Sequence, residues 1–250
     1  HCPALGDLDY DQSNQLPVDE IRHDWLAAHI TLDGLDVVEI GANMGALSLT
    51  LAIEHGCRTL AFEPGAAFSR ASALLATICG VQNQMTCIEK AVVLDDLSDL
   101  SPADVVVHLN VLHHAGAVYD QDRVTALGGW DAYAVDYLSR LRAVAPVLFF
   151  QTGNTSGGTR LFAGEDALDH VAALLAAAGW DVENIGIIED FTNLAYQTYT
   201  PASLAKAPRF RCQRSPGSDM VEYFEHDRLV ASLKTGMAQR PLWLCRRQEG

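Results

Sequence analysis

The sequence predicts an α/β fold in which a doubly wound, mostly parallel sheet has helices on both faces. Short, continuously apolar runs alternate with longer amphipathic stretches, as expected for parallel strands that are covered on both sides. One of these runs, 36–40, ends in a glycine-rich turn that leads directly into a helical pattern. With 250 residues and 49% hydrophobic content, the chain is large enough to bury one such core.

The turn after the first strand predicts a ligand site. It contains Gly41, Asn43 and Gly45, and a helical pattern begins at Ala46. Glycine lets a backbone approach a ligand closely, and a helix N-terminus offers N–H groups and the positive end of a dipole to a polar or anionic group. We therefore expect a ligand over residues 41–45.

The second predicted strand, 58–62, leads into Glu63, and Pro64 breaks the pattern directly after it. Glu63 follows Gly41 by 22 residues. This is close to the spacing at which a carboxylate binds a ribose in nucleotide-binding βαβ units. An isolated glutamate at a strand end is more often simply solvated, but the glycine turn upstream favours a ribose-binding role. The dinucleotide fingerprint fits poorly, because it requires glycine where this chain has Asn43.

The segment from Glu39 to Gly45 resembles a different first motif, acidic-x-Gly-x-Gly-x-Gly, of class I S-adenosylmethionine-dependent methyltransferases. Asn43 replaces the middle glycine. This departure is physically mild, because asparagine tolerates positive φ better than most residues.

A later segment strengthens the resemblance. The run 104–109 reads as a buried strand, and Asn110-Val-Leu-His-His follows it. This pattern is similar to the fourth motif of small-molecule methyltransferases. The motifs occur in the family's order between Glu39 and His114.

The resemblance implies a Rossmann-like, seven-stranded sheet that binds S-adenosyl-L-methionine and transfers a methyl group to an oxygen or nitrogen atom of a small molecule. Family members place residues near the adenine after the third strand, here predicted at 85–88. The implied cofactor-binding residues are Glu39, Gly41, Asn43, Gly45, Glu63, Pro64, Lys90, Ala91 and Asn110.

Two adjacent histidines, His113 and His114, are the candidate catalytic residues. Positioning supplies most of the acceleration in methyl transfer, but an acceptor that carries a proton also needs a base, and a neutral imidazole titrates near working pH. His113 is favoured slightly over His114. Asp190 could join them around a metal ion, but no ligand spacing identifies such a site, so none is predicted.

The chain divides into four predicted segments. They are a helical leader (1–35), the cofactor-binding core (36–190), an insertion or substrate-side segment (191–239), and the last strand with the C-terminus (240–250). Signals within the insertion are mixed, strand-like at 195–200 and helical at 222–233. The insertion could contact substrate or another subunit, and the sequence leaves both interpretations open.

Charge and composition restrict the partners. The formal charge is −15, and the only local basic cluster is three arginines between 209 and 214, so nucleic acid is disfavoured. No stretch has the roughly 18–20 apolar residues of a membrane span, and no signal-peptide pattern opens the chain. Cys57, Cys79 and Cys87 are expected to be buried thiols, which indicates a reducing, cytoplasmic setting.

Two alternative functions stay open, a nicotinamide-dependent oxidoreductase and a nucleoside-binding domain without catalysis. A short-chain dehydrogenase would usually show Tyr-x-x-x-Lys, and no tyrosine here has lysine four residues later. A cofactor-binding fold does not prove turnover. The sequence identifies neither the acceptor nor the oligomeric state.

Overall fold

The computed structural model describes residues 18–156, 159–161, 168–214, 220–234 and 240–249. The strands of its main sheet are β1 (Asp36–Ile40), β2 (Arg58–Phe62), β3 (Met85–Ile88), β4 (Val105–Leu109), β5 (Val147–Gln151), β8 (Trp180–Asp190), β9 (Ala195–Tyr199) and β13 (Leu242–Arg247). The helices are α1 (Val18–Ala27), α2 (Ala46–His55), α3 (Ala66–Ile78), α4 (Gln121–Ala126), α5 (Trp130–Val144) and α6 (Leu168–Ala177). Short 3-10 turns include η3 (Leu94–Asp99), η4 (Leu112–His114) and η5 (Leu204–Lys206).

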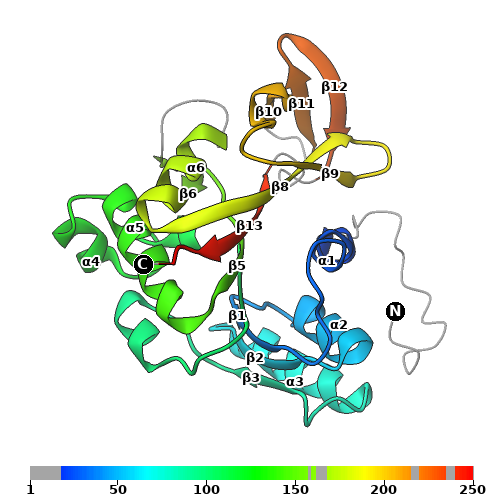
Figure 1. Cartoon of the computed structure of the whole chain (residues 1–250), viewed down its shortest axis with the longest axis vertical. Helices are drawn as coiled ribbons and strands as arrows, with labels where there is room; N and C mark the ends of the chain where they lie inside the picture. The colour runs from blue at the N-terminus through cyan, green and yellow to red at the C-terminus, as the bar shows by residue number, and fades with distance from the viewer. Residues whose placement is uncertain (1–17, 157–158, 162–167, 215–219, 235–239, 250) are drawn as a thin grey trace.

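The strand order is β3-β2-β1-β4-β5-β13-β8-β9 (Figure 1). β1 to β5 are parallel, and β13 runs antiparallel to both β5 and β8. The predicted doubly wound α/β fold is therefore confirmed, with eight strands in place of the expected seven. The additional strand is β9, which pairs antiparallel with β8 at the sheet edge and falls where the sequence had a strand-like pattern.

Alternate residues of the central strands face opposite sides of the sheet. Val105 and Val107 join one hydrophobic cluster with residues of α1 and α2. Val106, between them, joins the other cluster, which includes residues of α5 and α6. Because both faces are buried, these strands read as continuous apolar runs rather than alternating ones.

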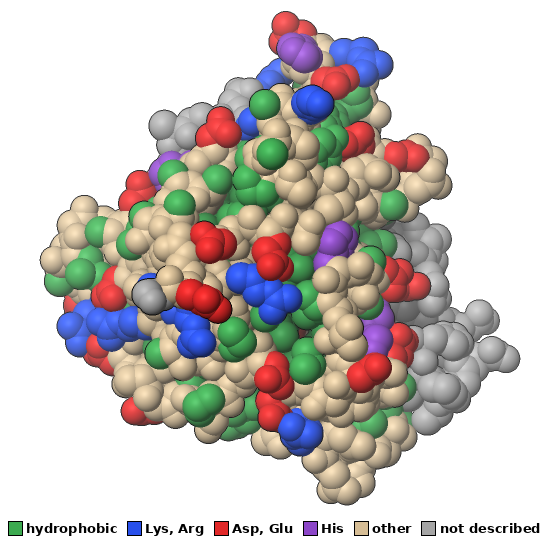
Figure 2. Space-filling model, in the orientation of Figure 1, with side chains coloured by type: hydrophobic (Ala, Val, Ile, Leu, Met, Phe, Trp, Pro, Cys, Tyr) green, Lys and Arg blue, Asp and Glu red, His purple; other side chains and the backbone are tan. Residues whose placement is uncertain are grey.

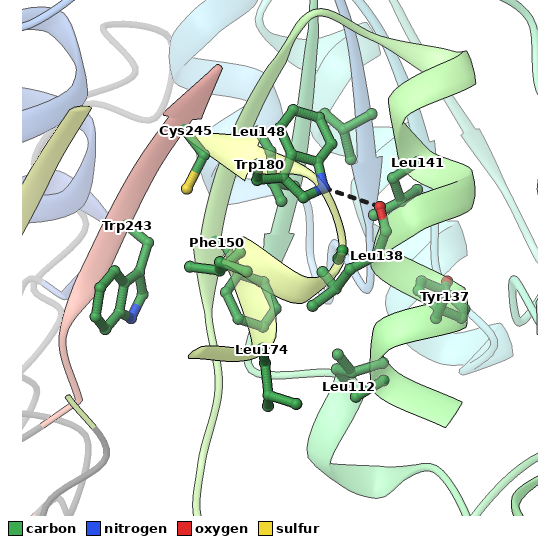
Figure 3. Close-up of a cluster of buried hydrophobic side chains, with 14 of the residues drawn as sticks. Leu112, Tyr137, Leu138, Leu141, Leu148, Phe150, Leu174, Trp180, Trp243 and Cys245 are labelled. Atoms are coloured by element: carbon green, nitrogen blue, oxygen red, sulfur yellow. Dashed lines mark hydrogen bonds between the residues drawn. The ribbon is translucent and has the colours of Figure 1, made fainter. Parts of the chain in front are cut away.

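The larger of the two clusters anchors α5 to the sheet (Figure 3). Leu138 and Leu141 of α5 are fully buried beside Leu148 and Phe150 of β5. The indole Nε1 of Trp180 donates to the carbonyl oxygen of Leu138 at 2.8 Å, so its one polar atom is satisfied inside the core. This packing fixes the end of β5, which borders the candidate site.

The strand order reverses between β1 and β4, which are neighbours in the sheet although two strands separate them in the chain. In open α/β sheets, ligands bind in the crevice outside the carboxyl ends of the strands at such a reversal. The turn after β1 and the segment after β4 both lie at this point.

The predicted insertion contains a small antiparallel sheet that stands at the top of Figure 1. Its strands are β10 (Phe210–Arg214), β11 (Val221–Glu225) and β12 (Arg228–Leu233). The helix expected at 222–233 is therefore wrong. Val221 and Tyr223 are buried two residues apart, which is the period of a strand.

The predicted helical leader contains α1, and its residues 1–17 lie outside the described part of the chain. Cys57 is a buried thiol as expected, and Cys87 is a half-buried one. Cys79 is disulfide-bonded, so the expectation of a thiol is wrong there. The cysteines therefore no longer support a reducing compartment, and the cytoplasmic location stays a prediction. In the described ranges, no helix is both long and apolar enough to cross a membrane.

Candidate active site

Left-handed backbone shapes the turn after β1. Gly41, Asn43 and Gly45 have φ values of 79°, 53° and 74°, so the asparagine adopts the positive φ that its place in the motif requires. The N–H groups of Gly41 and Ala42 donate to the carbonyl oxygen of Phe62 at 2.8 and 3.0 Å, which ties the turn to the end of β2. α2 begins at once, with glycine at its N-cap, so the positive end of its dipole lies at this turn.

Glu63 bridges the turns that follow β1 and β2. One carboxylate oxygen, Oε2, accepts from the N–H of Asn43 at 2.9 Å, and Oε1 accepts from the N–H of Gly65 at 2.7 Å. A carboxylate has about four acceptor positions. Both oxygens can therefore still accept hydroxyl groups, and Pro64 is exposed beside them.

The loop after β3 lies next to Glu63, because the N–H of Glu63 donates to the carbonyl oxygen of Ile88 at 3.0 Å. Ala91 is half-buried in this loop, and Lys90 is exposed. The Lys90 ammonium pairs with Asp96 of η3 at 2.8 Å, which directs its side chain toward η3. The structure thus brings the two predicted adenine-side positions close to the predicted ribose-binding residue.

Glu39 is buried in β1 and holds the start of α2. Its Oε2 accepts from the backbone N–H of Ser48 at 3.2 Å and from the Ser48 hydroxyl. Burial raises the pKa of Glu39 to about 7, against an ordinary value of 4.5. Its evident contact is with the helix that follows the turn, and a direct cofactor contact stays a prediction.

Asn110, at the tip of β4, belongs to a polar network that the sequence did not predict. Its Nδ2 donates to Oε1 of Gln151 at 2.7 Å, and its Oδ1 accepts from Nη1 of Arg240 at 2.6 Å. Arg22 of α1 donates to the same Gln151 oxygen. The sequence could have indicated Gln151, because it is a polar residue at the end of an apolar strand, much like Asn110. Arg22 and Arg240 could not be found in this way, because they lie far from Asn110 in the chain.

The two candidate catalytic histidines differ in their surroundings. His113 is buried, and its Nδ1 accepts from the N–H of Gly153 at 3.3 Å, so in the neutral ring the proton is on Nε2. Burial lowers the pKa of His113 to about 3. His114 is only half-buried, and its ring centroid lies 4.0 Å from that of His113. Burial, followed by the charge of Arg240, lowers the pKa of His114 too.

A cavity of about 350 Å³ lies next to Gly153, since Thr152 and Asn154 on either side of that glycine line it, whereas His113 and His114 do not. It lies between the segment after β5, β10 and the approach to β13, and its lining includes Thr152, next to the Gly153 that contacts His113. Four of the lining residues are arginines: Arg160, Arg209, Arg211 and Arg240. From the sequence, Asp190 could have joined His113 and His114 as a metal ligand. Among the described residues, these three side chains do not form a cluster of potential metal ligands.

The left-handed turn predicts a measurable cost for a methyl group at Gly41. A Cβ there would lie 2.1 Å from Cγ2 of Val111, whereas one at Gly34, also left-handed at φ 69°, would meet nothing within 4 Å. We expect Gly34→Ala to cost about 1–2 kcal/mol of unfolding free energy and Gly41→Ala roughly 1 kcal/mol more. Urea denaturation checks this, and Val111→Ala should partly rescue Gly41→Ala. Equal costs at the two glycines would contradict the steric argument.

No protein-family model matches the chain, and no curated protein matches its sequence. Solved structures do share its fold. The 4+2 cyclase SpnF has 13% sequence identity and a TM-score of 0.55, over 93% of this chain and 82% of SpnF. Magnesium protoporphyrin IX methyltransferase from Synechocystis PCC 6803 was solved with bound S-adenosylmethionine. It has 15% identity and a TM-score of 0.50, over 99% of this chain and 95% of its own.

A candidate RNA methyltransferase from Pyrococcus horikoshii has 12% identity and a TM-score of 0.50, over 92% of this chain and 82% of its own. At these identities the similarity concerns the fold. The strand order, the turn after β1 and these alignments over nearly the whole chain agree. The chain has the Rossmann-like fold of class I S-adenosylmethionine-dependent methyltransferases.

Proposed function

We propose that the protein is an S-adenosylmethionine-dependent methyltransferase that acts on an oxygen or nitrogen atom of a small molecule. The main support is the Glu63 carboxylate, which bridges the N–H groups of Asn43 and Gly65. It lies at the carboxyl end of β2, beside the reversal of strand order where doubly wound sheets bind nucleotides. A ribose could donate to both of its oxygens there.

In this proposal the cofactor lies across the carboxyl ends of β1, β2 and β3. Its methionine part approaches the backbone of the 41–45 turn, near the start of α2 and the tip of β4. Its adenine lies near Pro64, Lys90 and Ala91, and Ile88, at the end of β3, has an exposed apolar side chain that could pack against it. Glu39 and Asn110 support the turn and the strand tip through the hydrogen bonds described above.

The acceptor is placed in the cavity lined by the four arginines. Its volume of about 350 Å³ suits a small molecule, and the guanidinium groups favour one that carries negative charge. On the face drawn in Figure 2, basic side chains occur in small groups mixed with acidic ones, and the whole chain carries a charge of −15. Nucleic acid usually requires a more extended basic surface.

The chemistry needs few protein groups. S-adenosylmethionine supplies a methyl group on a sulfonium, so the chain must hold the acceptor in line with it and exclude water. The acceptor atom also has to lose its proton. We assign this step to His114, because Nδ1 of the neighbouring His113 already accepts from the Gly153 N–H.

Cofactor binding is the direct test of the proposal. S-adenosylmethionine and S-adenosylhomocysteine should bind the full chain at micromolar levels and raise its melting temperature by mass action. Calorimetry with NAD in parallel distinguishes the alternative of an oxidoreductase. Binding of NAD without any response to either sulfur nucleoside would refute the proposal.

Turnover needs its own measurement, because the similar fold of the cyclase SpnF shows that fold alone does not establish methyl transfer. Mass spectrometry should detect a methylated product when small carboxylated or phosphorylated acceptors with a hydroxyl or amine are supplied. Cofactor binding without any such product would favour a nucleoside-binding domain, and methylated RNA would correct the acceptor class.

Replacing Glu63 by alanine should weaken cofactor binding by roughly tenfold or more. Charge-assisted hydrogen bonds to the ribose contribute about 1.5–3 kcal/mol, and 1.4 kcal/mol is a factor of ten. Glu183→Ala is a matched control, because Glu183 pairs with Arg246 at 3.1 Å in β8, away from the strand tips. Calorimetry on both variants checks the prediction, and unchanged affinity in folded Glu63→Ala would show that the ribose is bound elsewhere.

A further inference from the structure

Three potential metal ligands meet where α1 packs against α2. They are His23 of α1 and Glu54 and His55 at the end of α2, and their ligand atoms all lie within 4.8 Å of one another. The Nε2 atoms of the two histidines are 2.9 Å apart, and Nε2 of His23 lies 3.7 Å from Oε2 of Glu54. The 10-residue length of α2 separates this group from the turn at Gly45 by roughly 15 Å, so it lies apart from the candidate active site.

The other nitrogen of each imidazole lies near a carboxylate. Nδ1 of His23 is 3.2 Å from Oδ1 of Asp24, and Nδ1 of His55 is 3.5 Å from Oδ1 of Asp33. A carboxylate in this position favours the tautomer with the proton on Nδ1. That tautomer directs an Nε2 lone pair of each ring toward the other, an arrangement that a bound cation stabilises. The same carboxylate–histidine pairs orient the ligands of known zinc sites.

We propose that His23, Glu54 and His55 bind a zinc ion through two imidazole nitrogens and one carboxylate oxygen. Zinc ligands lie at about 2.0–2.2 Å, so two ligand atoms of a tetrahedral ion are roughly 3.3–3.6 Å apart. The separations of 2.9 and 3.7 Å from Nε2 of His23 fall on either side of this value, and all the ligand atoms lie within 4.8 Å of one another, so rotation of the side chains would bring them around one ion. Two nitrogens and one oxygen suit zinc better than calcium or magnesium, which prefer oxygen alone.

The ion would fasten the leader helix to the core. His23 comes from α1, whereas both other ligands come from α2, so zinc would crosslink two helices that otherwise meet through side-chain packing. The residue before His23 is Arg22, whose guanidinium donates to Gln151 at the end of β5. Zinc would thus also fix the helix that supplies Arg22 to the polar network of Asn110.

Titration of the full, chelator-treated chain with zinc chloride tests the proposal. Calorimetry should show one equivalent bound, and zinc should raise the melting temperature, with EDTA reversing the rise. Cobalt chloride serves as a second probe, because its absorption spectrum identifies the ligand atoms. Bands typical of nitrogen and oxygen ligands are expected, and an intense sulfur-to-cobalt band would show that cysteines bind the ion instead and would overturn the assignment.

Variants on exposed side chains keep the test independent of folding. Glu54→Gln should lower zinc affinity by roughly 100-fold, and Asp33→Asn, which only removes the carboxylate beside His55, by roughly tenfold. His170→Gln is the matched control, since this histidine pairs with Asp131 elsewhere on the molecule and its loss should leave zinc affinity unchanged. Far-UV circular dichroism confirms that the variants are folded.

Two results would overturn the proposal. The first is a wild-type chain that takes up no zinc, in which case His23 and His55 only share a hydrogen bond. The second is equal zinc affinity in the wild type, Glu54→Gln and Asp33→Asn, which would place the ion at other residues.

Discussion

Replacing His114 by alanine should lower the rate of methyl transfer by about 10²- to 10⁴-fold and leave cofactor affinity nearly unchanged, because a general base acts in the transition state. His114 is half-buried in η4, just beyond the tip of β4. Its pKa is lowered by burial and then by Arg240, so the ring is neutral and able to accept a proton near pH 7. Single-turnover methyl transfer under saturating cofactor measures the effect.

The neighbouring histidine provides the comparison. His113→Ala removes a fully packed ring and the acceptor of the Gly153 N–H, so it should lower the melting temperature more than the rate. His170→Ala, at a half-buried position of α6 away from the candidate site, should change neither. If His113→Ala instead proves stable and slow while His114→Ala keeps the wild-type rate, the base is His113, as the sequence alone had slightly favoured.

The residues that the sequence placed correctly belong to the parallel strands and the turns directly after them. Continuous apolar runs identified β1, β4 and β5, because strands buried on both faces have no polar side to interrupt the pattern. Carboxyl ends of neighbouring parallel strands meet at one edge of the sheet. Gly41 and Glu63 could therefore be placed together from the order of their strands, and the structure joins their turns through hydrogen bonds.

The residues that the sequence missed depend on contacts between distant segments. Arg22, Gln151 and Arg240 meet at the tip of β4, yet more than a hundred residues separate Arg22 from Gln151. The sequence around each of these three residues gives no sign that it belongs to a polar network. The small sheet was missed for a different reason: apart from Val221 and Tyr223, the residues of β11 and β12 are exposed or only half-buried, so few positions show the alternation of apolar and polar residues that marks a strand. The four-part division of the chain stays a prediction.

Exchanging Glu39 for glutamine should raise the unfolding free energy above pH 7 and flatten its dependence on pH. Burial raises the pKa of this carboxyl to about 7 in the folded chain, against 4.5 in the unfolded one. The folded state therefore retains a proton that the unfolded state releases between these values. The stability this provides is fully present below pH 4.5 and is lost as the pH rises through 7.

The loss amounts to roughly 3 kcal/mol, because each unit of pKa difference corresponds to about 1.4 kcal/mol. Glutamine keeps an oxygen that accepts from the Ser48 hydroxyl but carries no charge at any pH. The unfolding free energy of the variant should therefore exceed that of the wild type mainly at pH 8. Urea denaturation at pH 5.5 and 8 measures this.

Asp36→Asn, in the same strand, is the control, and its effect on stability should be opposite. Pairing with Arg58 lowers the pKa of Asp36, so the Asn variant should be less stable than the wild type at both pH values. If the wild type loses no more stability than Glu39→Gln between pH 5.5 and 8, the pKa of Glu39 is not raised in the folded chain.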